Sequence, residues 1–374
     1  MQKITYLDHN ATTKLSPEAL AKMNEVYPLP LNNSSTHQLG RLGYQLVEEA
    51  REEVQKFLNG QNYQVIFTGS STEATNQVFF SSGVKTILFC PFEHSSVYNS
   101  RPKDAEIIEL AALENGLLDL EDLKAKLDKI SDKNFLVSLM LANNETGAIQ
   151  PVKETAKIVH QKGGLFHCDI VQAAGKIPVD LEELNPDFVS ISAHKIRGPQ
   201  GVGALLVRKG IDIEPLIHGG KQEKGKRAGT SNTAGIAGFG TACKLAATRL
   251  ALYKTQVAAL RDHLESELKK IAGNKVKFFC DNVARLPNTS YVALRDVDAQ
   301  TQLIFFDLNK ICVSAGAACS SGTTAAPRVL KTMNVSPEFS NSAIRVSLCL
   351  ETTEQEINHF IATWKKLYER TVQK

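Results

Sequence analysis

The chain has 374 residues, of which 43% are hydrophobic and 22% are charged, so it is long enough for two or three domains with a sizeable core. Its 43 basic and 40 acidic side chains give a net charge of +3, a balance that argues against nucleic acid or a membrane surface as a partner. No signal-peptide pattern is visible at the start, and no apolar run is long enough to span a membrane.

The seven cysteines are scattered along the chain without CxxC pairs. This spacing favours free thiols in a reducing compartment over a disulfide framework or a zinc site. We therefore expect a cytoplasmic protein and predict no metal ligands. No internal repeat or low-complexity tract interrupts the chain.

In chain order, the N-terminal part predicts alternating helices and strands. Ser16 followed by Pro17 predicts a helix start, and residues 38–58 predict an amphipathic helix. Residues 65–68 predict a strand that leads into a helix at Ser70. The free N–H groups of such a helix start can hold an anion, although an ordinary capped helix has the same pattern.

Further along, apolar runs predict strands at residues 87–90 and 135–140, with a helix at residues 119–130 between them. A polar residue follows each strand: His94 after the first and Asn144 after the second. A histidine or an asparagine in such a place is more often an ordinary loop or turn residue, so neither one indicates a function by itself.

Two later apolar runs lead to charged side chains. Residues 163–168 are followed by Asp169, and residues 187–195 end in Ser-x-His-Lys with Lys195. Ligands bind at the carboxyl ends of parallel strands, so Asp169 and Lys195 are expected to converge on one cavity. A buried carboxylate suits a protonated pyridine nitrogen and a buried lysine suits an aldehyde, which are the requirements of pyridoxal phosphate. Taken alone, Lys195 could instead extend past the strand end into solvent.

The rest of the chain predicts a second, smaller α/β region. Residues 202–207 predict a strand that runs back, and residues 218–230 form a basic loop of a kind that is usually just a solvated surface. Residues 233–272 predict a helical linker into that region. Its predicted elements are strands at residues 275–279, 289–293 and 311–313 and a helix at residues 299–309.

The motifs at residues 167–172 and 192–195 resemble the cofactor motifs of class V aminotransferase-like enzymes, in particular the cysteine desulfurases of the NifS/IscS type. The similarity runs from Tyr6 to Thr353, nearly the whole chain. It implies an α/β fold of fold-type I, with a large, mostly parallel sheet and a smaller α/β domain. It also implies pyridoxal 5'-phosphate as the cofactor and L-cysteine as the substrate.

The resemblance also assigns roles to individual residues. Cofactor binding is assigned to Lys195, Ser71, Thr72, His94, Asn144, Asp169, Gln172, Ser192, His194 and Thr230. Catalysis is assigned to Cys319, Lys195 and His94, and substrate binding is assigned to Arg345 and Asn10.

Several of these roles are specific contacts in the family. Ser71 and Thr72 would hold the cofactor phosphate, and Thr230 would reach the phosphate in the partner subunit of a homodimer. His94 would stack on the pyridine ring and move protons, and Asn144 would bond the ring hydroxyl.

Cys319 distinguishes a desulfurase from an aminotransferase, because transamination needs no protein thiol. It lies among small and polar residues from about 314 to 327, which predict a mobile exposed loop without a large apolar anchor. The segment resembles the Ala-Cys-Ser-Ser-Gly loop of the desulfurases, which implies that the Cys319 thiolate takes sulfur from L-cysteine and leaves L-alanine. Without the lysine cavity, Cys319 would be an incidental surface cysteine.

Arg345 is predicted to lie in a strand near the C-terminus. Its planar guanidinium can bind a substrate carboxylate through two hydrogen bonds, although a structural ion pair fits a strand arginine equally well. The sequence departs from the family pattern at Lys221, where glycine is usual, and at Cys349-Leu350, where Gly-Arg is usual.

The resemblance further implies a homodimer that passes sulfur to an iron–sulfur scaffold or another acceptor protein, for cluster assembly or tRNA thiolation. We expect a large cofactor domain at residues 14–255 and a small domain made of residues 1–13 and 256–374. The alternatives are a selenocysteine lyase, a class V aminotransferase of small amino acids, and a non-catalytic sulfur-relay protein on a decayed enzyme fold. No direct contact with nucleic acid or a membrane is expected.

Overall fold

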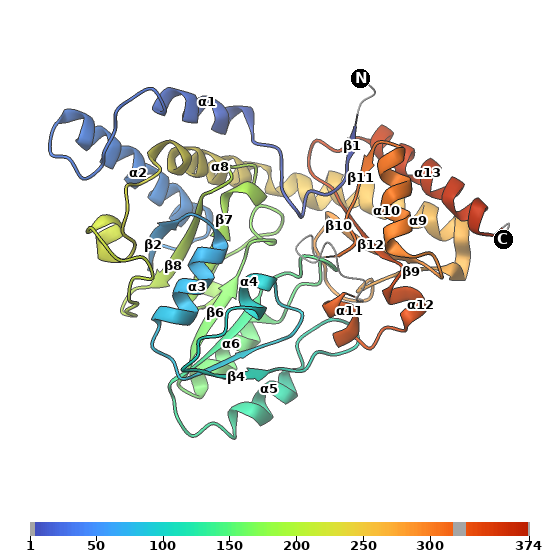
Figure 1. Ribbon diagram of the computed structural model, residues 1–374, viewed down its shortest axis with the longest axis horizontal. Helices are drawn as coiled ribbons and strands as arrows, with labels where there is room; N and C mark the ends of the chain where they lie inside the picture. The colour runs from blue at the N-terminus through green and yellow to red at the C-terminus, as the bar shows by residue number, and fades with distance from the viewer. Residues whose placement is uncertain (1–3, 317–326, 373–374) are drawn as a thin grey trace.

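The structure is a computed structural model that describes residues 4–316 and 327–372. Figure 1 shows a large sheet with its helices, coloured blue to yellow, beside a second group of elements, coloured orange to red apart from the blue strand β1. The predicted Cys319 lies outside the described residues.

The large sheet forms the centre of the fold. Within the described residues it has seven strands, in the spatial order β2, β8, β7, β6, β5, β3 and β4. Its strands are β2 (Tyr63–Thr68), β3 (Thr86–Phe89), β4 (Glu106–Glu109), β5 (Phe135–Met140), β6 (Leu165–Asp169), β7 (Phe188–Ser192) and β8 (Gly203–Arg208). Only β8 among them runs antiparallel to its neighbours, β2 and β7, which confirms the prediction of a strand that runs back.

Both faces of this sheet are buried. Alternate residues of β2 enter two different apolar clusters, with Val65 and Phe67 in one and Ile66 in the other. Leu136 and Val137 of β5 divide in the same way. Because successive side chains point to opposite faces of a strand, this division requires cover on both sides of the sheet. Burial of both faces explains why the strands are continuous apolar runs in the sequence.

A second group of strands lies beside the large sheet. Its members are β9 (Val276–Phe278), β10 (Thr289–Leu294) and β12 (Ala343–Ser347) in one antiparallel sheet, and β1 (Thr5–Tyr6) and β11 (Ile311–Cys312) in a parallel pair. The N-terminal strand therefore lies against a strand more than 300 residues later in the chain (Figure 1). Strands β9, β10, β11 and β12 contribute to one apolar cluster, which also contains Phe306, Phe360 and Trp364.

The described helices are α1 (Pro17–Val26), α2 (Gln38–Phe57), α3 (Ser71–Ser81), α4 (Ser95–Tyr98), α5 (Leu120–Leu127), α6 (Val152–Gln161), α7 (Leu181–Leu184), α8 (Thr233–Leu252), α9 (Ala258–Ala272), α10 (Ala299–Leu308), α11 (Arg328–Thr332), α12 (Pro337–Ser340) and α13 (Glu354–Val372). The sequence did not predict α6, α13 or strand β4. Among the described residues, no helix is long and apolar enough to cross a membrane.

A nearly continuous helix joins the two groups of elements. It consists of α8, a π-helical turn at Tyr253–Val257, and α9. The predicted domain boundary at residue 256 falls in that π turn. The division into residues 14–255 and residues 1–13 with 256–374 stays a prediction, whereas the α/β architecture with a mostly parallel sheet is confirmed.

Candidate active site

A cavity of about 410 Å³ opens at the carboxyl ends of the parallel strands. β5, β6 and β7 deliver Met140, Asp169 and Ser192 to its wall as their last residues. Of the residues predicted to bind the cofactor, the cavity brings together Ser71, Thr72, His94, Asn144, Asp169, Gln172, Ser192, His194 and Lys195. It does not include Thr230, Asn10 or Arg345 in its wall.

Asp169 places a buried carboxyl group at the floor of the cavity. Its Oδ1 accepts a hydrogen bond from the Val171 N–H at 2.8 Å, and no hydrogen bond to Oδ2 is found within the part of the chain that the structure describes. Burial raises the pKa of Asp169 to about 6, although the Val171 N–H and Lys195 act in the opposite direction. Ionisation of the buried Asp169 carboxyl group therefore costs free energy unless a cation lies beside it. A protonated ring nitrogen would be such a cation.

Lys195 follows β7 in a single 3₁₀ turn at Ala193–Lys195. Its ammonium Nζ donates to the carbonyl oxygens of Asn10, at 2.5 Å, and Ala11, at 2.7 Å. Lys195 does not extend past the strand end into bulk solvent, because it lines the cavity and is half-buried. Its neighbour His194 is fixed by Thr12, whose Oγ1 lies 3.0 Å from Nδ1.

His94 lies after β3, where its backbone starts the short helix α4. Its Nδ1 accepts from the backbone N–H of Ser96 at 3.1 Å, so in the neutral ring the proton resides on Nε2. Burial, with Lys195 as the next cause, lowers the pKa of His94 to about 4. His94 is therefore a neutral ring near pH 7, which suits stacking on a planar cofactor.

The N-terminus of α3 forms the end of the cavity that suits an anion. Ser70 caps this helix by accepting from the Glu73 N–H at 3.1 Å, which confirms the predicted helix start. Gly203 lies beneath the turn, and a Cβ atom there would come within 2.9 Å of the Ser71 nitrogen. The close packing holds Ser71 and Thr72, with the free N–H groups of the helix start, at the cavity wall.

Asn10 is a buried junction between the two groups of elements. Its carbonyl oxygen accepts from Gln172 Nε2 at 2.9 Å, in addition to Lys195. Its side-chain amide donates to Thr289 Oγ1 at 2.9 Å and accepts from Asn288 Nδ2 at 3.0 Å. Both ends of the side-chain amide are used within the protein, and the predicted contact of Asn10 with substrate stays a prediction.

Arg345 is 2% exposed on β12 and lies close to the cavity without lining it. Its Nη2 pairs with Asp8 at 2.7 Å, and its Nη1 donates to the Asn144 carbonyl oxygen at 2.9 Å. Its buried Nε has no hydrogen-bond partner among residues 4–316 and 327–372. Part of the guanidinium is thus committed to an ion pair, and the predicted role as a carboxylate clamp stays a prediction.

Thr230 is exposed and lies outside the cavity wall. The basic loop that precedes it is attached to α2 by a buried pair in which Arg51 Nη1 lies 2.9 Å from Glu223 Oε2. Glu223 and Lys224 have φ angles of 46° and 56°, a left-handed conformation rare for residues with side chains. The loop that departs from the family pattern at Lys221 is therefore held in a defined path by α2.

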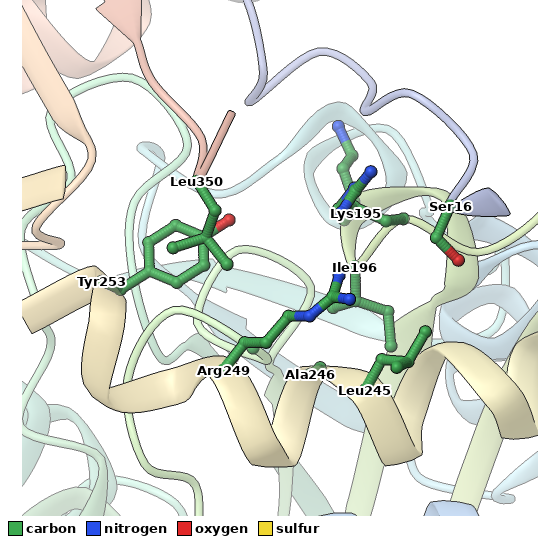
Figure 2. A pocket seen from close by; sticks show the side chains of 10 residues that line it. Ser16, Lys195, Ile196, Leu245, Ala246, Arg249, Tyr253 and Leu350 are labelled. Atoms are coloured by element: carbon green, nitrogen blue, oxygen red, sulfur yellow. The ribbon is translucent and has the colours of Figure 1, made fainter. Parts of the chain in front are cut away.

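A second, smaller cavity of about 20 Å³ adjoins Lys195 (Figure 2). Leu245, Ala246 and Arg249 of α8 line one side of it. Its arginines already have acidic partners, because Arg249 pairs with Glu18 at 2.8 Å and Arg197 pairs with Glu351. Glu351 follows the Cys349-Leu350 departure, so that segment contacts the turn that carries Lys195.

Several polar groups of the site were not predicted from the sequence. Thr12 and Gln200 line the cavity, whereas Glu93 and Lys176 are buried near it. The four-residue spacing between Gln172 and Lys176 was a local signal for the lysine, whose Nζ lies 2.7 Å from the glutamine Oε1. No cluster of metal-ligating side chains is found among the described residues.

The donor set of the cavity fits pyridoxal 5'-phosphate. It combines a buried carboxyl group at Asp169, a lysine amine at Lys195, a helix N-terminus at Ser71 and the neutral ring of His94 in one cavity wall. A cofactor with a ring nitrogen, an aldehyde and a phosphate would use each of these groups. The side chains present therefore match the group that the sequence predicted.

Comparisons with known proteins agree with this geometry. The model of the family "Aminotransferase class-V" matches residues 5–360. The chain therefore belongs to the class V aminotransferase family, whose cofactor is pyridoxal 5'-phosphate.

Within that family, the chain is similar over its full length to proteins named as cysteine desulfurases. Cysteine desulfurase IscS of Dictyoglomus turgidum is 37% identical over 381 residues, which cover 99% of this chain and 96% of the relative. A cysteine desulfurase of Cereibacter sphaeroides is 39% identical and covers 95% of this chain and 93% of its own. The resemblance to the NifS/IscS type is confirmed.

Solved structures give the same result. A NifS-like protein from Rickettsia africae superposes with a TM-score of 0.91 at 36% identity, covering 98% of this chain and 100% of its own. A second structure, described as a NifS-like protein, superposes with a TM-score of 0.89 at 34% identity. The fold class predicted from the sequence is confirmed by these neighbours.

Proposed function

We propose that the protein is a pyridoxal-phosphate-dependent cysteine desulfurase that converts L-cysteine to L-alanine and holds the sulfur as a persulfide on Cys319. The observation that carries the proposal is the meeting of Asp169 and Lys195 at one cavity, in a chain similar along its whole length to cysteine desulfurases. That similarity favours a desulfurase over the selenocysteine lyase and the aminotransferase.

The cavity residues would hold the cofactor by its three functional groups. Asp169 would pair with the ring nitrogen, Lys195 would bond the aldehyde carbon, and the α3 N-terminus with Ser71 and Thr72 would bind the phosphate. His94 packs on the ring face. When bound, the cofactor withdraws electrons from the α-carbon of the amino acid attached to it.

Lys195 is the proposed proton carrier of the site. Its Nζ is held between the carbonyl oxygens of Asn10 and Ala11, two acceptors that place the amine at the cavity wall. His94 is less suited to accept a proton, because its Nδ1 already accepts from Ser96 and burial lowers its pKa to about 4. We therefore assign proton transfer at the substrate carbon to Lys195.

The sulfur step belongs to Cys319. Its thiolate attacks the substrate sulfur, so that an S–S bond forms while the carbon–sulfur bond of the substrate breaks. The substrate carbon takes up a proton and leaves as L-alanine, and Cys319 keeps the outer sulfur until an acceptor or a thiol reductant removes it. Arg345 and Asn10 are the proposed contacts of the substrate, and a carboxylate at Arg345 would compete with Asp8, which pairs with Nη2.

The assembly that we propose is a homodimer joined along α1 and α2. These helices lie at the outer edge of the molecule, beside the loop that carries Thr230 (Figure 1). Large exposed apolar side chains on these helices and the segment between them support the proposal: Leu20, Tyr27, Leu29, Leu39, Leu42 and Tyr44. An exposed Thr230 that lies outside its own cavity is free to serve the cavity of a second subunit.

Cysteine as substrate and a sulfur-acceptor protein as partner follow from the desulfurase function. An iron–sulfur scaffold is the acceptor that we propose, with a role in cluster assembly, tRNA thiolation or both. We also propose a cytoplasmic location, because the described cysteines are all free thiols. The balanced net charge of +3 supports the expectation of no direct contact with nucleic acid.

Release of sulfide and alanine from L-cysteine with a thiol reductant tests the function. The wild-type protein should be yellow and should release both products in equal amounts. Lys195→Ala and Cys319→Ala should each lose product release, whereas Cys319→Ala should remain yellow. A colourless protein would support the decayed-enzyme alternative, and full activity of Cys319→Ala would favour a lyase or an aminotransferase.

A further inference from the structure

Lys176 is a buried lysine that the reaction does not use. It is 3% exposed, and within the described part of the chain no carboxylate is among the groups that act on it. Its Nζ contacts two side-chain amide oxygens instead, Gln172 Oε1 at 2.7 Å and Asn10 Oδ1 at 3.1 Å. Burial of an amine without an acidic partner costs free energy.

The contact with Gln172 determines how that side chain meets the cavity. Lys176 donates to the amide oxygen, and the Asn10 carbonyl oxygen accepts one N–H of the amide nitrogen at 2.9 Å. An amide nitrogen carries two N–H groups, so one donor of Gln172 is left. Gln172 is 6% exposed and lines the cavity, which is the direction in which that donor can act.

Reversal of the amide would place its oxygen against the Asn10 carbonyl and its nitrogen against the Lys176 amine. The first contact is repulsive, and the second loses the donor that Lys176 supplies. Two independent neighbours therefore favour the same orientation. The sequence alone cannot show this, because Asn10 and Gln172 are 162 residues apart.

We propose that Lys176 is a positioning residue that locks the Gln172 amide with an N–H toward the ring oxygen of the bound cofactor. The donor stabilises that oxygen in its anionic form. The proposal rests on the proposed function, since it concerns the same cofactor site, but it needs no turnover of substrate.

Charge reinforces the geometry. Burial lowers the pKa of Lys176 well below the ordinary value, with Lys195 and Arg345 as further causes. The neutral amine is therefore favoured, and a neutral amine still donates an N–H to the Gln172 amide oxygen. The other titratable or charged groups around the site are Asp169, Glu93, His9, His94, His194, Lys195 and Arg345.

The pH midpoint of the visible absorption of the bound cofactor measures this effect in the holoenzyme without substrate. Lys176→Met keeps the length of the side chain and removes its donors. The midpoint should rise by about one pH unit, a tenfold change in the proton-dissociation constant. In a Gln172→Ala background the same substitution should add less than about 0.3 unit, because residues that act as one unit are not additive.

Gln172→Glu provides a second variant that keeps an acceptor for Lys176 and removes the amide N–H. It should raise the midpoint at least as much as Lys176→Met. Val159→Ala, a buried core change on α6, is the control for general loosening and should leave the midpoint unchanged.

An equal shift from Lys176→Met with and without Gln172 would overturn the proposal, because the lysine would then act through its charge alone. An unchanged midpoint in both Lys176→Met and Gln172→Glu would overturn it as well. If the wild-type protein bound no cofactor, the proposed function itself would fail, and that result is distinct from either outcome.

Discussion

The Arg345 guanidinium lies against the Asp8 carboxylate, with 2.7 Å between Nη2 and Oδ1. The two residues are 337 positions apart, and each belongs to the strands beside the large sheet or their extension. Breaking a buried ion pair by removing one partner typically costs several kcal/mol. A substrate carboxylate that binds Arg345 would therefore compete with Asp8 or replace it.

Arg345→Lys and Asp8→Asn separate the two roles of this pair. If Arg345 holds the substrate carboxylate, Arg345→Lys should raise the KM for L-cysteine about tenfold to a hundredfold, because a charge-assisted hydrogen bond contributes roughly 1.5–3 kcal/mol. Asp8→Asn should not raise KM, since it removes the competing charge. Steady-state kinetics and the Tm of each variant check this. Equal losses of Tm with unchanged KM in both variants would indicate a purely structural pair.

The pKa of Asp169 predicts how pH changes the stability of the apoprotein. Burial raises it from 3.8 to about 6, so the folded state disfavours the ionised group and is destabilised as the pH rises through that interval. Asp169→Asn removes this penalty, and at pH 8 the variant apoprotein should be more stable by up to roughly 3 kcal/mol. The difference should vanish near pH 3, below the pKa of the unfolded state.

Urea unfolding of both apoproteins at the two pH values measures this difference in the free energy of unfolding. The holoprotein gives the opposite sign, because a cationic ring nitrogen would stabilise the ionised Asp169. Cofactor should then protect the wild type more than Asp169→Asn against unfolding at pH 8. Equal protection of the two proteins would contradict the proposed pairing.

Gly316, three residues before Cys319, lies where the chain has little room for a side chain. Its φ is +80°, and an added Cβ would lie 2.8 Å from Glu145 Oε2 and 3.2 Å from the Tyr291 hydroxyl oxygen. Gly316→Ala should reduce kcat for alanine release several-fold while the absorption of the bound cofactor stays unchanged. The reason is that the chain that leads to Cys319 must shift.

Gly83→Ala is the matched control, because Gly83 has a φ of +73° and no atom within 4 Å of its Cβ position. It should lose about 1–2 kcal/mol of stability from backbone strain and retain full kcat. Similar kcat values in the two variants would show that the Glu145 contact has no influence on turnover.

The exposed position of Thr230 predicts that each active site of the homodimer contains residues from both subunits. Thr230→Ala and Lys195→Ala should each inactivate a homodimer, but mixing them should restore activity in the hybrid. One of its two sites then has an intact Lys195 and receives Thr230 from the other subunit. With random exchange about a quarter of all sites are intact. Alanine release after refolding the mixture checks this, and no recovery would mean that Thr230 does not act across the interface.

The strand ends of the site could be predicted from the sequence because their signals are local. Asp169 and Lys195 each follow a buried apolar run, and the strand order brings those runs together as neighbours. The cap at Ser70 was likewise visible, since a helix start depends on a few adjacent residues. The strand at β8 was predicted with its reversed direction.

The remaining parts depend on contacts between distant positions. The ion pair of Asp8 with Arg345 joins the two ends of the chain, and the partners of Asn10 include Asn288 and Lys176. Local periodicity carries no information about such pairs. The sequence therefore predicted Asn10 as a substrate contact without indicating that its side-chain amide is held within the protein.

Detection of a persulfide on Cys319 would show whether this thiol carries the sulfur. The holoenzyme should be given L-cysteine without a reductant, alkylated, digested and examined by mass spectrometry. We predict that the peptide with Cys319 gains the mass of one sulfur atom, together with one L-alanine per gained sulfur, and that Lys195→Ala shows neither. Formation of alanine with no added sulfur on Cys319 would contradict the account.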